Sequence, residues 1–410
     1  MKELIRLVAW LGLAVLACSG TEPNEEGDLV AEKTGTIMTK LAPRHAPDRE
    51  FRSLCGSGAL TEAGRATLTR SPFLQQVSST GAFVVFRTKS SGAQAQVELT
   101  TLDGAAVTSV VAGTDASVRG GVQQVAELRG LEPNTAYCYT LPGLTERAGF
   151  RTAPAAGSDA TVRFAVWGDS GYGGTDQATL YDQIMTVPFD FVLHAGDLAY
   201  DAGTRSQFQR TVFDVYAPLL REFAMFPVSG NHEYETEDAA PYLESFVLPE
   251  NGDRERYYSF DWGNVHFVGL DTERIGARQA QWLDADLMSN RLPWTIVLGH
   301  RPPYSSGEHG GDSDFIRHFI PVLEKYQVPL VLSGHEHQYE RTHVRNGVTY
   351  IVTGGGGRGT RPVGTSSFTA FAEAVIHFLF VEIRGNRLVL HAIDGVGREF
   401  DQTVIERSAI

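Results

Sequence analysis

The sequence predicts an all-β sandwich domain followed by an α/β (α+β) domain, and two observations carry this prediction. Over residues 71–153, short runs of alternating apolar and polar residues are separated by turn residues, which is typical of a small antiparallel sandwich. From residue 160 to about 405, apolar strands alternate with helical stretches, which indicates an α/β arrangement. A length of 410 residues, with 42% hydrophobic and 20% charged residues, suits a globular protein of two or three units.

The N-terminus has the features of an export signal. Lys2 and Arg6 flank the start of a short apolar core over residues 7–16, which is too short to span a bilayer. Val15-Leu16-Ala17-Cys18 resembles a bacterial lipobox and predicts a lipoprotein-type signal peptide over residues 1–18, with a plain signal peptide as the alternative. We therefore expect an exported protein that contacts the membrane only through a lipid anchor in the cell envelope, or otherwise a periplasmic or secreted protein.

Residues 19–70 lack sustained periodicity and are rich in Gly, Pro, Thr and charge, which predicts a tether with some order near Cys55. If Cys18 carries lipid, Cys55 and Cys138 are the two remaining cysteines. In an exported protein they could form a disulfide, or they could be two buried thiols. The sequence leaves both alternatives open.

In the first domain, strands are expected over residues 81–88, 94–99 and 122–128, and the segment closes with residues 137–139 and 149–152. This region contains no cluster of catalytic residue types, so we expect it to have a supporting role. Residues 153–157, Ala-Pro-Ala-Ala-Gly, are typical of a linker.

In the second domain, five expected strands each end in a short polar motif. These strands cover residues 162–167, 189–195, 225–229, 295–298 and 330–333, and helices are expected over residues 175–185 and 279–288. Ligand sites in α/β sheets lie at the carboxyl ends of strands. The five motifs are Gly168-Asp169-Ser170-Gly171, Gly196-Asp197-Leu198-Ala199-Tyr200, Gly230-Asn231-His232-Glu233, Gly299-His300 and Gly334-His335-Glu336-His337.

The donor types in these motifs indicate a metal site. Two Asp, one Tyr, one Asn and four His supply oxygen and imidazole donors, which suit Fe, Zn and Mn, and the absence of Cys argues against a structural zinc site. Taken singly, each motif is weak, because a Gly-Asp pair is usually a turn and a single His usually a core residue. Five such motifs in order favour a site for two metal ions.

The ordered set resembles the metallophosphoesterase superfamily, and Tyr200, three residues after Asp197, makes the chain similar to the purple acid phosphatases. Arg256-Tyr257-Tyr258-Ser259-Phe260 and Gln338-Tyr339-Glu340-Arg341 add to this resemblance. It covers about residues 71–398, since plant-type members also carry a fibronectin type III-like domain before the catalytic one. The resemblance implies such a domain over residues 71–153 and a four-layer sandwich for the catalytic domain over residues 160–405.

The resemblance also implies a role for each matching residue. A ferric ion would be held by Asp169, Asp197, Tyr200 and His337. A divalent ion, Zn, Mn or Fe, would be held by Asp197, Asn231, His300 and His335, so that Asp197 bridges the two ions. His232 and His309 match positions where the family keeps histidines that face the substrate, and are expected to be catalytic.

We therefore expect an acid phosphatase that hydrolyses phosphate monoesters by in-line attack of a metal-bound hydroxide. The alternatives are a phosphodiesterase or nucleotidase of the same superfamily with two divalent ions, and a surface-binding lipoprotein. A net charge of -14 without a basic block argues against a nucleic-acid partner and leaves small-molecule phosphate esters. Gly354-Gly355-Gly356-Gly357-Arg358-Gly359 lacks the ending of a P-loop and is expected to be a flexible turn at the rim of the pocket.

Overall fold

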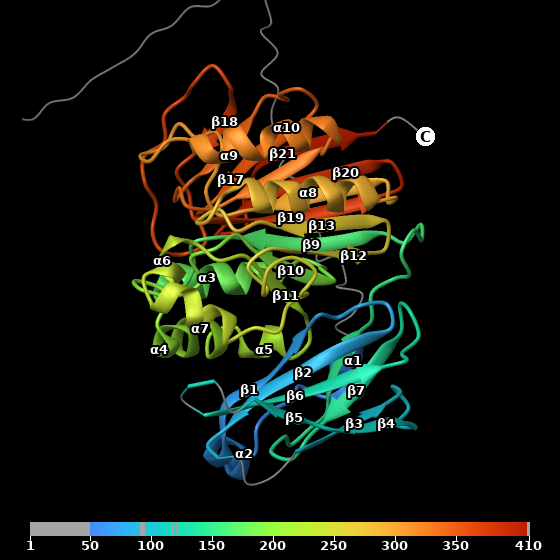
Figure 1. Cartoon of the computed structure of the whole chain (residues 1–410). Coiled ribbons are helices and arrows are strands. Elements are labelled where there is room, and N and C mark those ends of the chain that lie inside the picture. The colour runs from blue at the N-terminus through green and yellow to red at the C-terminus, as the bar shows by residue number, and fades with distance from the viewer. Residues whose placement is uncertain (1–49, 91–94, 116–117, 120, 408–410) are drawn as a thin grey trace, which may run out of the picture. The chain divides into compact units, whose positions relative to one another are not determined.

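The computed structural model describes residues 50–90, 95–115, 118–119 and 121–407 (Figure 1). All of these residues belong to one unit, Pro43–Ile410. The predicted signal peptide, Cys18 and residues 19–49 of the predicted tether lie outside the described residues. Within the described part of the chain, none of the helices combines the length and the apolar character that crossing a bilayer requires.

The first part of the described chain consists of two antiparallel four-stranded sheets. Their strand orders are β1-β2-β6-β5 and β4-β3-β7-β8. The strands are β1 Leu68–Gln75, β2 Gly81–Thr88, β3 Gln96–Thr100, β4 Ala106–Val111, β5 Gly113–Asp115, β6 Val122–Arg129, β7 Ala136–Thr140 and β8 Ala148–Arg151. The expected strands over residues 81–88 and 122–128 are confirmed by β2 and β6.

Residues 50–70, which we expected in the tether, are folded instead. They form helices α1 Glu50–Cys55 and α2 Glu62–Thr67 and the first residues of β1. Phe51 is buried, and a disulfide joins Cys55 to Cys138 with 5.4 Å between the Cα atoms. The Thr61 side chain caps α2 by accepting a hydrogen bond from the Gly64 amide at 2.8 Å. Helices this short show no sequence periodicity, which is why no pattern predicts them. The disulfide and the buried Phe51 help to hold this segment against the sheets.

The second part contains two larger mixed sheets. The six-stranded sheet has the order β11-β10-β9-β19-β20-β21, and the seven-stranded sheet has the order β12-β13-β14-β15-β17-β16-β18. The strands are β9 Val162–Trp167, β10 Phe191–His194, β11 Met225–Pro227, β12 Tyr258–Trp262, β13 Val265–Gly269, β14 Trp294–Leu298, β15 Leu330–Ser333, β16 Tyr339–Thr342, β17 Thr349–Thr353, β18 Thr369–Glu373, β19 His377–Arg384, β20 Arg387–Asp394 and β21 Glu399–Glu406. The five predicted strands are therefore divided between two sheets: β9, β10 and β11 in one, β14 and β15 in the other.

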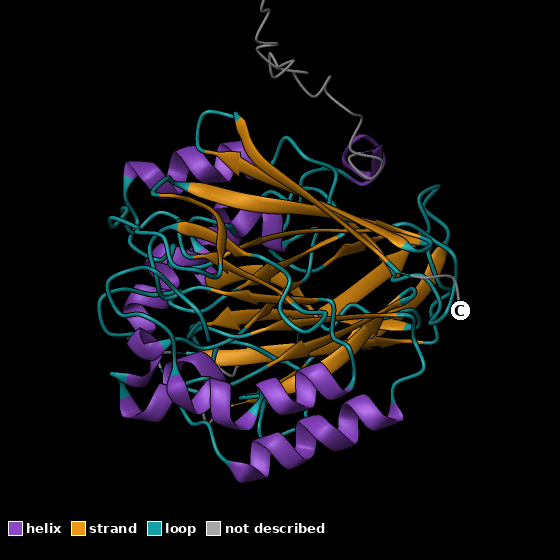
Figure 2. Ribbon diagram, turned by 90° about the horizontal axis from the view of Figure 1, so that it is seen from above, coloured by secondary structure: helices purple, strands orange, loops and turns teal. Residues whose placement is uncertain are grey.

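The two mixed sheets pack face to face, with helices outside them (Figure 2). Phe267 of the seven-stranded sheet lies 5.3 Å from Phe164 and 5.2 Å from Phe191 of the other sheet, measured between ring centroids. Buried Leu283 of α8 and Phe315 of α9 share a core with Val297 on the outer face of the seven-stranded sheet. The helices are α3 Thr175–Ile184, α4 Arg205–Phe208, α5 Ala217–Leu220, α6 Asn231–Tyr234, α7 Ala240–Leu243, α8 Ala277–Ser289, α9 Ser313–His318 and α10 Ile320–Lys325, with a π-helix η1 Gln209–Phe213 and a 3-10 helix η2 Glu237–Ala239.

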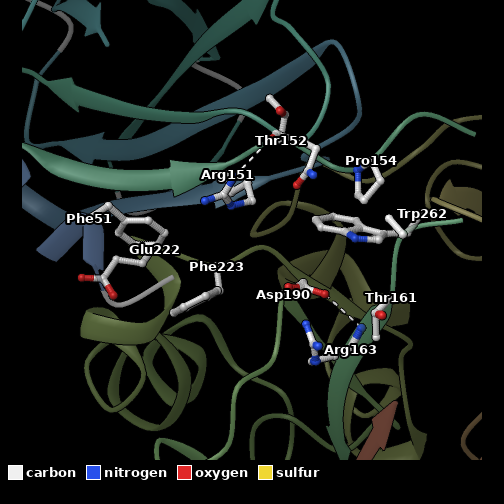
Figure 3. Close-up of a pocket in the computed structure, with 12 residues that line it drawn as sticks. Phe51, Arg151, Thr152, Pro154, Thr161, Arg163, Asp190, Glu222, Phe223 and Trp262 are labelled. Atoms are coloured by element: carbon white, nitrogen blue, oxygen red, sulfur yellow. Dashed lines mark hydrogen bonds between the residues drawn. The ribbon is translucent and has the colours of Figure 1, made fainter. Parts of the chain in front are cut away.

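Polar contacts and a cavity lie between the antiparallel sheets and the mixed-sheet region. Arg52 forms an ion pair with Glu222 at 2.6 Å, and the buried Arg70 donates to Gln209 at 3.0 Å. The cavity has a volume of about 410 Å³, and Phe223 and Trp262 are among its lining residues (Figure 3). No predicted site residue lines this cavity, so the candidate site lies elsewhere in the fold.

A histidine with two acidic partners on β13 predicts a pH dependence of stability. His266 Nδ1 lies 2.7 Å from Asp261 Oδ1, and Nε2 lies 2.8 Å from Asp286 Oδ2. Burial opposes the charged imidazolium, but the hydrogen bonds to the two carboxylates raise the pKa of His266 to about 9. Because the unfolded value is about 6.5, the contribution to stability is fully present below pH 6.5 and is lost as the pH rises through 9.

We therefore expect the free energy of unfolding to fall between pH 6 and pH 10 by roughly 1–2 kcal/mol more in the wild type than in His266→Gln, after allowance for solvent around Asp261. Urea unfolding at the two pH values measures this difference. The same fall in both proteins would show that the two ion pairs contribute nothing.

Candidate metal centre

The predicted ligands converge at the carboxyl ends of strands from both mixed sheets. Asp169 follows β9, Asp197 follows β10 and Asn231 begins α6 after β11. His300 follows β14, and His335 and His337 follow β15. The structure thus brings together residues that lie up to 168 positions apart, because the two sheets present the same ends of their strands at one place.

Three of these residues adopt backbone conformations that are uncommon outside glycine. Asp169, Asp197 and His335 have φ values of 60°, 54° and 69°. Each directly follows a glycine at a strand end, and Asp and His tolerate this left-handed region better than most residues. Such conformations cost free energy and are concentrated at functional sites.

One group of donors surrounds the Tyr200 hydroxyl. This oxygen lies 2.8 Å from Asp197 Oδ2, 3.1 Å from Asp169 Oδ1 and 3.2 Å from His337 Nε2. His337 Nε2 is also 3.5 Å from Asp169 Oδ1. All four side chains are buried. Their three oxygens and one nitrogen therefore point at a common position.

A second group of donors surrounds His300 Nε2. This nitrogen lies 3.1 Å from Asn231 Oδ1, 3.3 Å from His335 Nδ1 and 3.4 Å from Asp197 Oδ1. His300 Nδ1–H donates to the Ala195 carbonyl at 2.8 Å, which leaves Nε2 free as a ligand atom. Asp197 therefore faces the Tyr200 group with Oδ2 and the His300 group with Oδ1.

A family model for calcineurin-like phosphoesterases matches residues 162–339, a range that contains every donor of both groups. Residues 162–339 form a calcineurin-like phosphoesterase domain. This phosphoesterase domain has purple acid phosphatases among its homologues. Both donor groups therefore lie within this one domain.

Two relatives from Arabidopsis thaliana illustrate the homology. Purple acid phosphatase 21 is 33% identical over 255 residues, which are 55% of this chain and 56% of the relative. Purple acid phosphatase 23 is 32% identical over 281 residues, 56% of this chain and 61% of the relative. The chain thus spans somewhat more than half the length of these curated relatives.

A solved structure shows the shared fold. Purple acid phosphatase from yellow lupin (Lupinus luteus) seeds superposes with a TM-score of 0.71 at 23% identity, over 82% of this chain and 74% of that one. The two mixed sheets therefore have the metallophosphoesterase fold that the sequence predicts.

The charges of the phosphoesterase domain's donors fit a cation. Burial would raise the pKa of Asp197, but His300 and His232 hold it well below its usual range. Burial and the carboxylates of Asp169 and Asp197 raise the pKa of Tyr200 well above its usual value. Ligand atoms of Asp169, Asp197 and His300 all lie within 4.8 Å of one another. Buried carboxylates at this spacing require a compensating positive charge, and the mixed oxygen and nitrogen donors suit Fe, Zn or Mn.

Other residues of the phosphoesterase domain hold the ligand loops in place. The buried Glu233 carboxylate accepts hydrogen bonds from four backbone amides, those of Gly230, Asp197, Leu198 and Ala199, at 2.7–3.1 Å. Glu233 therefore fixes the loops that carry Asp197 and Asn231. Sequence reasoning missed Thr272, whose hydroxyl accepts from the amides of His300 and Arg301. The available signal was the apolar strand over residues 265–269, which also ends in polar residues.

Each of the two predicted catalytic histidines lies beside a different donor group. The His232 ring is 4.4 Å from the Tyr200 ring, and its Nδ1 bonds to the Asp201 carbonyl. The His309 ring is 4.8 Å from the His335 ring, and its backbone amide donates to Glu336 at 2.6 Å. The His309 side chain is 43% exposed, so it borders solvent. Both histidines lie beside the site, as the sequence predicts.

Proposed function

We propose that this chain is a dinuclear metal-dependent acid phosphatase that hydrolyses phosphate monoesters. The observation that carries the proposal is the division of Asp197 between two donor groups, Oδ2 at 2.8 Å from the Tyr200 hydroxyl and Oδ1 at 3.4 Å from His300 Nε2. A single carboxylate that faces two sets of ligands is what a two-ion site requires. The purple acid phosphatase homologues also indicate a hydrolase of phosphoric esters.

Asp169, Asp197, Tyr200 and His337 would hold a ferric ion. Asp197, Asn231, His300 and His335 would hold a divalent ion, Zn, Mn or Fe. Burial and the neighbouring carboxylates raise the pKa of Tyr200, so a phenolate at this position would need a strong positive charge beside it. When bound, the two ions supply Lewis-acid stabilisation of the phosphoryl oxygens and lower the pKa of water.

The chain's own residues supply the proton that the reaction needs. In hydrolysis a water oxygen bonds to phosphorus, the ester P–O bond breaks, and the departing oxygen takes up a proton. His232 and His309 border the two donor groups and would orient the substrate and give this proton. The His232 ring is oriented by its bond to the Asp201 carbonyl, and the His309 ring by the contact of its Nδ1 with Glu336 Oε1 at 3.2 Å.

Comparison of two chromogenic esters tests monoester specificity. We expect the purified protein to hydrolyse p-nitrophenyl phosphate at acid pH with a kcat/KM at least about tenfold above that for bis(p-nitrophenyl) phosphate. A preference for the diester would instead identify a phosphodiesterase of the same fold. Hydrolysis of neither ester, with no bound metal, would favour a surface-binding protein.

We also propose that the first eight strands form a fibronectin type III-like domain. Two observations support this assignment. The strand orders β1-β2-β6-β5 and β4-β3-β7-β8 divide consecutive strands as in immunoglobulin-like sandwiches. Near the start of β7, the Tyr137 hydroxyl accepts a hydrogen bond from the Glu132 amide at 3.0 Å, as in a tyrosine corner.

Export of the protein, with a lipid anchor at Cys18, is part of the proposal. The disulfide between Cys55 and Cys138 supports an oxidising compartment. Mass spectrometry of the membrane fraction tests the anchor. A mature chain that begins beyond Cys18 without lipid would exclude it.

A further inference from the structure

The glycine-rich segment after β17 packs against the metal ligands. We expected a flexible turn here, but Gly354, Gly355, Gly356 and Gly357 are buried. The Gly356 amide donates to the Gly168 carbonyl at 2.9 Å, and the Arg358 amide to the Asp169 carbonyl at 3.0 Å. A Cβ atom on Gly356 would lie 2.1 Å from the Gly168 oxygen, so only glycine permits this approach. The segment therefore has a fixed position beside Asp169.

This segment places two arginines beside the site. The Arg358 guanidinium carbon lies 5.3 Å from the centroid of the Tyr200 ring and 4.2 Å from that of Tyr172. Arg361 donates from its backbone amide to the His337 carbonyl at 3.0 Å and from Nη1 to the His335 carbonyl at 3.2 Å. One loop thus places two positive charges beside Tyr200, His335 and His337, which belong to the two donor groups.

Each guanidinium group also has one acidic partner that an anion can replace. Arg358 pairs with Asp201 at 3.3 Å and Arg361 with Glu308 at 3.7 Å, and these two acidic side chains are 71% and 67% exposed. Exposed ion pairs of this length contribute little free energy. Arg301 differs, because Glu273, only 10% exposed, holds it with two bonds of 2.8 and 2.9 Å. Arg358 Nη2 and Arg361 Nε, the atoms of these exposed pairs, are therefore available for a ligand, whereas Arg301 is committed to Glu273.

We propose that Arg358 and Arg361 form an anion subsite that binds a second phosphate group on the substrate. This inference rests on the proposed phosphatase activity and narrows its substrate class to phosphate esters whose leaving group is itself phosphorylated. Guanidinium groups bind phosphate oxygens through charge-assisted hydrogen bonds. A substrate with one phosphate at the metal ions would place its second phosphate against Arg358 and Arg361, in exchange for Asp201 and Glu308.

A matched pair of substrates tests the subsite: glucose 6-phosphate, and glucose 1,6-bisphosphate with its second phosphate. We expect the wild type to show a kcat/KM for the bisphosphate about tenfold or more above that for the monophosphate. Arg358→Gln and Arg361→Gln should each lower this selectivity ratio about tenfold, because each removes one charge-assisted contact. Metal content and circular dichroism of each variant are measured alongside.

Arg387→Gln is the matched control. Arg387 forms an equally long, exposed pair with Glu406 at 3.7 Å, and its loss should leave the ratio unchanged. If the wild type hydrolyses the bisphosphate and the monophosphate with similar kcat/KM, the subsite proposal is wrong. It is also wrong if Arg358→Gln and Arg361→Gln both keep the wild-type selectivity ratio. Hydrolysis of neither sugar phosphate nor p-nitrophenyl phosphate removes the proposed function and the subsite together.

Discussion

Asp197→Asn is expected to lower kcat for phosphate ester hydrolysis by at least about 10³-fold and to lower the bound metal from about two ions per chain to one or fewer. The substitution keeps the shape of the side chain but removes the negative charge that faces both donor groups. Tyr200 and His300 contact opposite oxygens of this carboxylate, so both ions should lose a ligand. Elemental analysis and a phosphatase assay of the purified variant measure the two effects.

Asp284→Asn is the control for the loss of one carboxylate. Asp284 lies on α8 and forms an exposed ion pair with Lys325 at 2.6 Å. This variant should keep wild-type metal content and turnover. An Asp197→Asn protein that retains two ions and near-normal activity would show that Asp197 does not bridge the site.

Gly171→Ala is expected to destabilise the protein by about 3 kcal/mol and to reduce metal binding. A Cβ atom at this position would lie 1.6 Å from the Leu198 carbonyl oxygen. The Gly171 carbonyl also accepts the Tyr200 amide at 2.8 Å. The added methyl group must therefore move the loop that carries Asp197 and Tyr200. Denaturant unfolding and metal analysis test both consequences.

Gly276→Ala provides the comparison. Gly276 precedes α8 in extended backbone, and no atom lies within 4 Å of a Cβ atom built there. Its substitution should cost no more than about 1 kcal/mol, because Ala is a poorer N-cap residue than Gly but meets no close contact here. Equal effects of the two substitutions would mean that the close approach of Gly171 to Leu198 does not position the metal loop.

The site was more predictable from sequence than the arrangement of the sheets. The strand ends at Trp167 and Ser333 were predicted to the residue, because an apolar run followed by Gly and a polar motif is a local signal. The donors could be assembled from those ends, since the carboxyl ends of neighbouring parallel strands meet at one edge. All seven predicted metal ligands and both histidines predicted to be catalytic lie in or beside the two donor groups.

The division into two sheets could not be predicted, because it depends on distant pairings. Strand β9 pairs with β19, and Val166 lies opposite Leu379, more than 200 positions later in the chain. Some order near Cys55 was expected, but the fold of residues 50–70 as a whole was missed, because the disulfide, the Thr61 cap and the pairing of β1 with β2 leave no periodic signal. The Gly354 segment was misjudged because glycine indicates both mobile turns and close backbone contacts. The hydrogen bonds from the Gly356 and Arg358 amides to the carbonyl oxygens of Gly168 and Asp169 identify a close backbone contact, and only the structure shows these bonds.

The central claim is that Tyr200 and Asp197 join a ferric and a divalent ion in one site. Metal quantification of the purified protein together with its visible spectrum tests this claim most directly, because a ferric phenolate absorbs visible light. We predict about two ions per chain, one of them iron, and a visible band that disappears in Tyr200→Phe. A colourless protein that is nevertheless replete with iron, or a band that persists in Tyr200→Phe, would contradict the claim.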